Sequence, residues 1–167
     1  MKNLLLISLG SNLGDKLFFL RSGKKNLMNN IDGFLAESPI FETEPFGVDH
    51  NSSYLNQVLA FQTQLSPFEI LSITSAIEIE CGRTHKRDLK PRTLDIDLLS
   101  VGNEIIETPN LILPHPRIQI RRFVLTPLEE ICPGWIHPVY KLSPSEMNKQ
   151  LDDTSWIKKW NPAPELP

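Results

Sequence analysis

The stretch TLDIDLLSV, residues 93–101, alternates like a β-strand that has one buried face. Because a strand places residues i and i+2 on the same side, Asp95 and Asp97 share one face, roughly 7 Å apart along the backbone. The apolar residues between them point the opposite way, toward a core. Two neighbouring carboxylates repel each other, and a divalent cation bound between them would turn that repulsion into binding. Mg²⁺ suits such a pair, because it takes one or two carboxylates and keeps its other positions for water and substrate phosphates.

The segments upstream of this strand predict an alternation of strands and helices. Strands are expected at residues 4–9, 34–43 and 54–63. A first helix is expected to follow one of the plausible caps Ser11, Asn12 and Asp15 and to run to about residue 30, and a second helix is expected from residue 67 to 81. Ser66 and Glu69 can form a capping box at the start of the second helix, and Gly82 can end it. The resulting order β-α-β-β-α-β is typical of a ferredoxin-like α+β core, with a mainly antiparallel sheet, helices packed on it and long active-site loops.

Two further elements follow the strand at 93–101. Gly102-Asn103 predicts a tight hairpin with residues 104–106 as its returning strand. A short helix is expected at residues 123–131. Residues 161–167 hold three prolines and are expected to form a tail or linker. The 167 residues thus suggest one domain over residues 1–160.

Composition narrows the function class. The net charge of −3 argues against a dedicated nucleic-acid binder, whose surface is usually basic. The two cysteines have no metal-ligand spacing, so a reducing cytoplasm is the expected location. The apolar run at residues 4–7 is too short for a signal peptide or a membrane span, and no membrane partner is expected.

Basic residues cluster on both sides of the aspartate pair. Residues 83–92 hold five Lys or Arg and one Asp, and residues 114–123 place His115 between two prolines and follow it with three arginines. Either cluster alone is read most simply as a solvated surface loop. Next to a cation site, however, arginines that can each bind two oxygens of a phosphate complete the parts that phosphoryl transfer needs.

Aromatic and amide side chains form a third candidate group. Tyr54 and Asn56 share a strand face, and the loop from Thr43 to Gly47 precedes them. An aromatic plane beside an amide can stack on and hydrogen-bond a flat polar heterocycle, with Phe123 as a second plane. The simpler alternative is that these aromatics belong to the core.

Two other motifs have a structural and a functional interpretation. Residues 10–15, GSNLGD, resemble a glycine-rich phosphate loop but lack the Gly-Lys-Ser/Thr ending, so a tight strand-to-helix turn is favoured. Glu78, near the end of the second helix, is of a kind that usually faces solvent, although it lies close enough to Arg83 to brace it or to reach a ribose.

Several of these segments together resemble one enzyme family. The matching stretches, between about residues 4 and 133, are 9–15, 42–45, 54–56, 82–83, 91–97, 114–117 and 121–125. In this combination and order they are similar to the 6-hydroxymethyl-7,8-dihydropterin pyrophosphokinases of folate biosynthesis. The resemblance implies transfer of diphosphate from ATP to the pterin hydroxymethyl group, with release of AMP. It implies ATP as co-substrate and two Mg²⁺ ions.

The resemblance also implies roles for individual residues. Asp95 and Asp97 would hold the metal ions, and Arg83 and Arg92 would stabilise charge on the transferred group. The residues implied at the ATP site are Glu78, Arg83, His85, Arg92, Leu98, His115 and Arg121. Those implied at the pterin site are Thr43, Pro45, Phe46, Gly47, Tyr54, Asn56, Asp95 and Phe123.

The chain departs from the family pattern in the loop before Pro91. Leu89 and Lys90 stand where some members carry a Trp, and His85 stands where others carry a second Arg. Some members are fused to a neighbouring folate enzyme, and the Pro-rich end would suit a cut linker. Two alternatives remain: another two-metal phosphotransferase or nuclease on the same sheet, and an RNA-binding domain of related topology.

Overall fold

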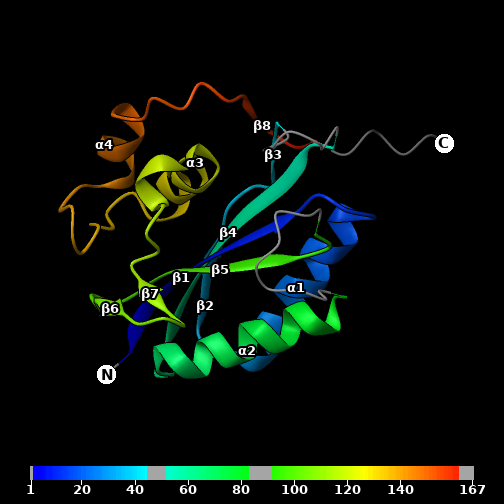
Figure 1. Cartoon of the computed structure of the whole chain (residues 1–167), viewed down its shortest axis with the longest axis horizontal. Helices are drawn as coiled ribbons and strands as arrows, with labels where there is room; N and C mark the ends of the chain where they lie inside the picture. Colours follow the sequence, from blue (N-terminus) through cyan, green and yellow to red (C-terminus); the bar gives the residue numbers. More distant parts are fainter. Residues whose placement is uncertain (1, 45–51, 83–91, 162–167) are drawn as a thin grey trace.

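The sheet and both predicted helices around it are present in the computed structural model, which describes residues 2–44, 52–82 and 92–161 (Figure 1). The strands are β1 (Asn3–Ser11), β2 (Phe34–Glu37), β3 (Phe41–Thr43), β4 (Tyr54–Thr63), β5 (Asp95–Val101), β6 (Ile106–Glu107), β7 (Ile112–Leu113) and β8 (Ile157–Lys159). The helices are α1 (Lys16–Asn30), α2 (Pro67–Glu80), α3 (Arg122–Ile131) and α4 (Pro144–Lys149), with a 3₁₀ turn at Ile118–Ile120. The predicted site residues Pro45, Phe46, Gly47, Arg83 and His85, and the altered positions Leu89 and Lys90, lie outside the described residues.

The main sheet has the order β5-β1-β4-β3-β8, with β2 also paired to β4. Every pairing in it is antiparallel. The first and third strands of the β-α-β-β-α-β unit are therefore neighbours at the centre, as in a ferredoxin-like core, and the predicted fold class is confirmed.

The helix boundaries follow from local capping. Asp15 caps α1 by accepting a hydrogen bond from Phe18 N through Oδ1 at 2.9 Å. Ser66 and Glu69 form the predicted reciprocal capping box at the start of α2. At the other end Gly82 has a φ of +89°, a left-handed conformation that favours glycine after a helix.

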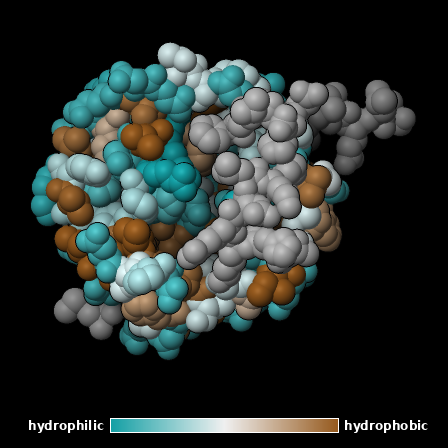
Figure 2. All heavy atoms as spheres, in the orientation of Figure 1, coloured by the Kyte–Doolittle hydropathy of each residue, from teal (hydrophilic) through white to brown (hydrophobic). Residues whose placement is uncertain are grey.

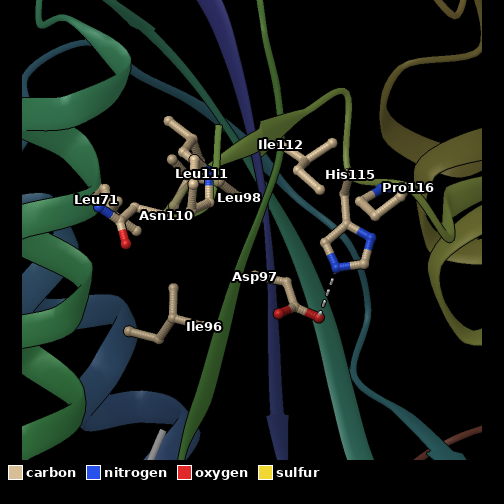
Figure 3. A pocket seen from close by; sticks show the side chains of 10 residues that line it. Leu71, Ile96, Asp97, Leu98, Asn110, Leu111, Ile112, His115 and Pro116 are labelled. Carbon is tan, nitrogen blue, oxygen red and sulfur yellow. Dashed lines mark ion pairs between the residues drawn. The ribbon is translucent and has the colours of Figure 1, made fainter. Parts of the chain in front are cut away.

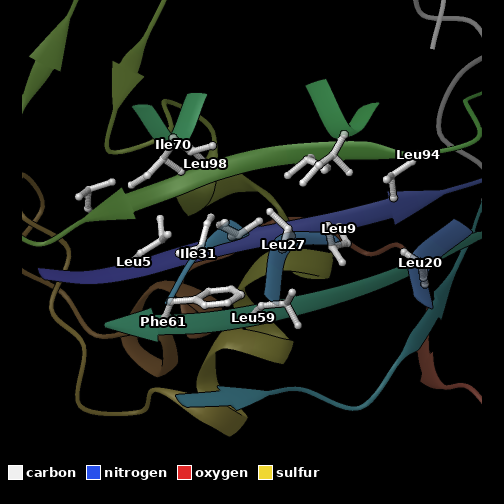
Figure 4. Close-up of a cluster of buried hydrophobic side chains, with 14 of the residues drawn as sticks. Leu5, Leu9, Leu20, Leu27, Ile31, Leu59, Phe61, Ile70, Leu94 and Leu98 are labelled. Carbon is white, nitrogen blue, oxygen red and sulfur yellow. The ribbon is translucent and has the colours of Figure 1, made fainter. Parts of the chain in front are cut away.

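Helices cover both faces of the sheet, which makes β4 buried on both sides. Leu9, Leu27 and Phe61 belong to the cluster between the sheet and helices α1 and α2 (Figure 4). Val58 and Leu128 belong to a second cluster, beneath α3 and α4. A ferredoxin-like core needs only the first layer, so α3 and α4 close the opposite face.

Two sequence-based expectations differ from the structure. The predicted strand 34–43 is split into β2 and β3 around Pro39, which has no N–H to donate to a ladder. Ser38 fills the gap, because its hydroxyl oxygen accepts a hydrogen bond from Val58 N at 3.0 Å. The predicted hairpin after Val101 is wrong, since β6 pairs with β7 rather than returning along β5.

A strand that the sequence patterns did not predict lies at the C-terminal end of the described residues. Residues 157–159 form β8, which pairs with β3 at the edge of the sheet, and Trp160 N donates to Ile40 O at 2.8 Å. No described helix is long and apolar enough to cross a membrane. Among the coloured residues of Figure 2, apolar side chains are scattered between polar ones rather than gathered into one large patch.

Candidate active site

Asp95 and Asp97 project from the face of β5 that α3 and α4 only partly cover. Leu94, Ile96 and Leu98 are buried in the cluster against α1 and α2, which confirms the predicted alternation. The two aspartate side chains keep 31% and 28% of their surface exposed. The carboxylates are therefore reachable by a ligand while their strand is fixed by the core behind it.

Each aspartate lies beside a basic side chain. Arg92 Nη1 is 3.0 Å from Asp95 Oδ2, and Arg121 Nη1 is 2.7 Å from Asp97 Oδ2. The Arg121 guanidinium also lies over the Phe123 ring, 5.4 Å from its centroid. These arginines offset the repulsion between the two carboxylates and hold positive charge where phosphate oxygens could bind.

The donor set suits Mg²⁺. Among the described residues no group of three or more His, Cys, Asp or Glu side chains gathers around a common point. A closed zinc-type cage is thus not formed by these residues, whereas two carboxylates with space for water and phosphate are what Mg²⁺ requires.

His115 adds a hydrogen-bond donor to this group. Its Nε2 lies 3.8 Å from Asp97 Oδ2 (Figure 3), and its Nδ1 accepts a hydrogen bond from Arg117 N at 3.1 Å. Burial lowers the pKa of His115, an effect that Asp97 opposes and the neighbouring arginines reinforce. Since Nδ1 is an acceptor, the neutral ring carries its proton on Nε2, directed toward the acidic pair.

A pocket of about 270 Å³ opens beside Asp97 and His115. Its lining residues are Leu71, Ile96, Asp97, Leu98, Pro109, Asn110, Leu111, Ile112, His115 and Pro116 (Figure 3). One part is apolar and the other carries the carboxylate and the imidazole, so the pocket can take a flat base and direct an attached anionic group toward Asp97. Of the predicted ATP-site residues, the pocket includes Leu98 and His115.

Glu78 occupies a different position from the solvent-facing one suggested by the sequence, and that interpretation is wrong. The residue is only 5% exposed, and its Oε1 accepts a hydrogen bond from Ile96 N at 2.8 Å. Glu78 therefore links α2 to the backbone of β5 between the two aspartates.

Asp95, Gly10 and Asn56 lie opposite one another on the neighbouring strands β5, β1 and β4 and form a row across the sheet. Gly10 pairs with Asp95 on one side and with Asn56 on the other. A Cβ on Gly10 would lie 3.2 Å from Asn56 Oδ1, closer than nearly all such contacts. Asn56 is 3% exposed, and its Nδ2 donates to Thr43 Oγ1 at 2.9 Å. Because Gly10 has no side chain, it leaves an open surface, called the floor below, between Asp95 and the amide of Asn56.

Tyr54 lies near this row. Burial is the main cause that raises its pKa, with a further contribution from Asp95 and an opposing one from Arg92. The predicted residues Tyr54, Asn56, Asp95 and Arg92 therefore lie in one region of the sheet. No sequence pattern indicated the position of Gly10 between Asp95 and Asn56, or of Leu71, Leu111 and Ile112 in the pocket. The last two lie on or beside the hairpin β6–β7, whose pairing was predicted incorrectly.

Known proteins resemble this chain over most of its length. Residues 6–133 match the model of the family described as 7,8-dihydro-6-hydroxymethylpterin-pyrophosphokinase. A 2-amino-4-hydroxy-6-hydroxymethyldihydropteridine pyrophosphokinase from Bacillus subtilis is 44% identical over 133 residues, which cover 79% of this chain and 80% of that protein. The folic acid synthesis protein FOL1 of Dictyostelium discoideum is 32% identical over 97% of this chain but only 24% of its own length.

A solved structure shares the fold. The crystal structure of wild-type Plasmodium falciparum HPPK-DHPS has a TM-score of 0.71 at 14% identity, over 90% of this chain, and this chain spans 45% of that one. The match to the family extends over most of the sequence, including both aspartates, His115 and the row through Gly10. This chain belongs to the 7,8-dihydro-6-hydroxymethylpterin-pyrophosphokinase family.

Proposed function

We propose that this chain transfers the diphosphate group of ATP to the hydroxymethyl oxygen of 6-hydroxymethyl-7,8-dihydropterin, releasing AMP. The observation that carries the proposal is the placement of two partly exposed carboxylates, each beside an arginine, with a buried amide on the same sheet face and a pocket at the edge strand β5. Family membership supports the same reaction.

Asp95 and Asp97 are the residues that would hold Mg²⁺, and we propose two ions at this pair. Magnesium supplies charge neutralisation for the phosphates when it is bound. Arg92 and Arg121 would exchange their carboxylate partners for phosphate oxygens, and the Nε2–H of His115 would donate to one of those oxygens. Because diphosphoryl transfer requires little covalent chemistry from the protein, holding the two substrates in line and stabilising charge are the main tasks.

The ATP base is proposed to enter the pocket beside Leu98. Its apolar lining by Leu71 and Leu111 can exclude water from a flat ring, while Asp97 and His115 face the phosphates. Glu78 would contribute indirectly, because its hydrogen bond to Ile96 N holds β5, the strand that carries Asp97. Arg83 and His85 are assigned to the phosphates through the family resemblance.

The pterin is proposed to lie over Gly10, between Tyr54 and Phe123. The amide of Asn56 is already fixed by Thr43, so it can hydrogen-bond the polar edge of the pterin without losing further side-chain freedom. Pro45, Phe46 and Gly47 are assigned to the same substrate by resemblance.

The cellular setting is part of the proposal. Cys81 and Cys132 are both free, in keeping with a reducing cytoplasm. Relatives such as FOL1 and HPPK-DHPS are much longer than the region that matches this chain, which supports a fusion or association with another folate-pathway enzyme.

Steady-state assays with ATP, Mg²⁺ and 6-hydroxymethyl-7,8-dihydropterin test the function. AMP should form only when all three are present, and chelation of the metal with EDTA should abolish its formation until Mg²⁺ is restored. Turnover that continues after chelation, or that needs no pterin, would contradict the proposal.

Gly10→Ala tests the floor between the carboxylates and Asn56. The added methyl group lies 3.2 Å from Asn56 Oδ1 and should displace the amide by a few tenths of an ångström. We expect the KM for the pterin to rise about tenfold, the equivalent of one weakened hydrogen bond, while the KM for ATP stays near its original value. Equal changes in both KM values would argue against a pterin-specific floor.

A further inference from the structure

The turn after β1 holds the main chain of Arg92 in place. Asn12 N donates to Arg92 O at 3.1 Å, and Asn12 Oδ1 accepts from Arg92 N at 2.7 Å. These two bonds join residues that are 80 positions apart in the sequence. Arg92 in turn places its Nη1 atom 3.0 Å from Asp95 Oδ2. A continuous chain of contacts therefore runs from the end of β1 to the acidic pair.

The Asn12 side chain also interacts with Tyr54 and lowers the pKa of that phenol, but it does not cap the helix that follows. The N-cap of α1 is Asp15, three residues later. The regular pairing of β1 with β5 ends at Gly10 and Asp95. Asn12 continues that pairing beyond the ladder, because its side-chain oxygen accepts the hydrogen bond that a main-chain carbonyl would accept within a sheet. At 3% exposure this contact is shielded from competing water.

We propose that Asn12 is a positioning residue for diphosphate transfer that acts through Arg92. The inference rests on the role proposed above for Arg92 in stabilising charge on the transferred group. A guanidinium can hold a fixed place only if its own backbone is fixed. Because both hydrogen bonds of Asn12 tie that backbone to the central sheet, the Arg92 side chain extends from a fixed main-chain position. Loss of the side-chain bond would let the guanidinium move away from the reacting phosphates.

Kinetics of Asn12→Ala test this role. We expect kcat to fall about 10- to 100-fold, a loss typical of a misplaced catalytic group, while both KM values stay within about threefold. Ser11→Ala is the matched control. Ser11 is equally buried, at 1% exposure, and among the described residues its Oγ has no hydrogen-bond partner. Its removal should leave kcat unchanged.

A double-mutant cycle separates positioning from independent action. In an Arg92→Ala background, Asn12→Ala should cause no further loss of kcat, because the group that it positions is absent. An equal further loss would overturn the inference. If Arg92→Ala lowers kcat but Asn12→Ala does not, the inference fails while the proposed role of Arg92 stands. If Arg92→Ala leaves kcat unchanged, the proposed role of Arg92 fails, and the inference with it.

Circular dichroism and thermal melting show whether each variant is folded. Should Asn12→Ala not give folded protein, Asn12→Ser replaces it in the cycle. Serine keeps a polar group in the turn but is too short to accept the hydrogen bond from Arg92 N. The same pattern of a lowered kcat that disappears in the Arg92→Ala background is expected, and additivity would again overturn the inference.

Discussion

Asp97→Asn should lower kcat/KM for AMP formation about 10³-fold, the scale seen when a key charge-stabilising group is removed from an active site. The amide has the shape of the carboxylate but not its charge, so it binds Mg²⁺ poorly and no longer offsets Arg121 at 2.7 Å. The fold should survive, because Asp97 is partly exposed and the core lies on the opposite face of β5. The rate is measured as AMP released at saturating Mg²⁺.

Glu37→Gln is the control for this loss of charge. Glu37 also forms an ion pair, with Lys24 at 2.7 Å, but on β2, at a distance from the acidic pair along the sheet. Its neutralisation should leave the rate of AMP formation unchanged. If Asp97→Asn keeps a rate within about threefold of the parent, the assignment of Asp97 as a metal ligand is incorrect.

Asn56→Leu should raise the KM for the pterin about 100-fold and change the KM for ATP by less than about twofold. Two hydrogen bonds to the substrate, at about 1–1.5 kcal/mol each, account for that factor. The substitution also removes the donor to Thr43 Oγ1 and places an apolar group at the floor of the site. Initial rates measured against each substrate in turn give both constants.

Gln57→Leu provides a matched comparison on the same strand. Gln57 is also a buried amide, at 6% exposure, and its Nε2 donates to Ser38 O. Adjacent strand residues face opposite sides of the sheet, so this variant alters the other face and should keep the parental KM for the pterin. Similar increases in both variants would mean that strand β4 is merely destabilised and that Asn56 has no specific contact with the substrate.

Local sequence patterns were sufficient to predict the central elements. The range 54–63 coincides with β4, and α1 and α2 begin at caps whose partners lie within three residues. The alternation over 94–98 placed Asp95 and Asp97 on the exposed face correctly. These features depend on periodicity and capping, which act between neighbours along the chain.

Features that depend on contacts between residues far apart in the sequence could not be predicted from local patterns. Gly102-Asn103 has the composition of a hairpin turn, yet Gly102 N donates to Leu4 O at 2.7 Å and the chain then turns to form the separate β6–β7 hairpin. β8 forms only because β3 has a free edge to accept it. The burial of Glu78 likewise follows from the position of Ile96 N, 18 residues away, rather than from the helix that carries it.

The candidate site combines both kinds of feature. The chemistry of the acidic pair could be inferred from two residues, but its surroundings come from strands, helices and loops that are far apart in the sequence. Gly10 becomes important only because the sheet sets it between Asp95 and Asn56. Asn12 becomes important only because the chain returns to it 80 residues later.

The identity of the products tests the central claim most directly. Phosphorus NMR of a reaction containing ATP, Mg²⁺ and 6-hydroxymethyl-7,8-dihydropterin should show AMP and a pterin diphosphate, with two coupled phosphorus signals on the pterin product. That result requires attack at the β-phosphorus of ATP. ADP with a pterin monophosphate, or ATP left intact by folded protein, would contradict the account.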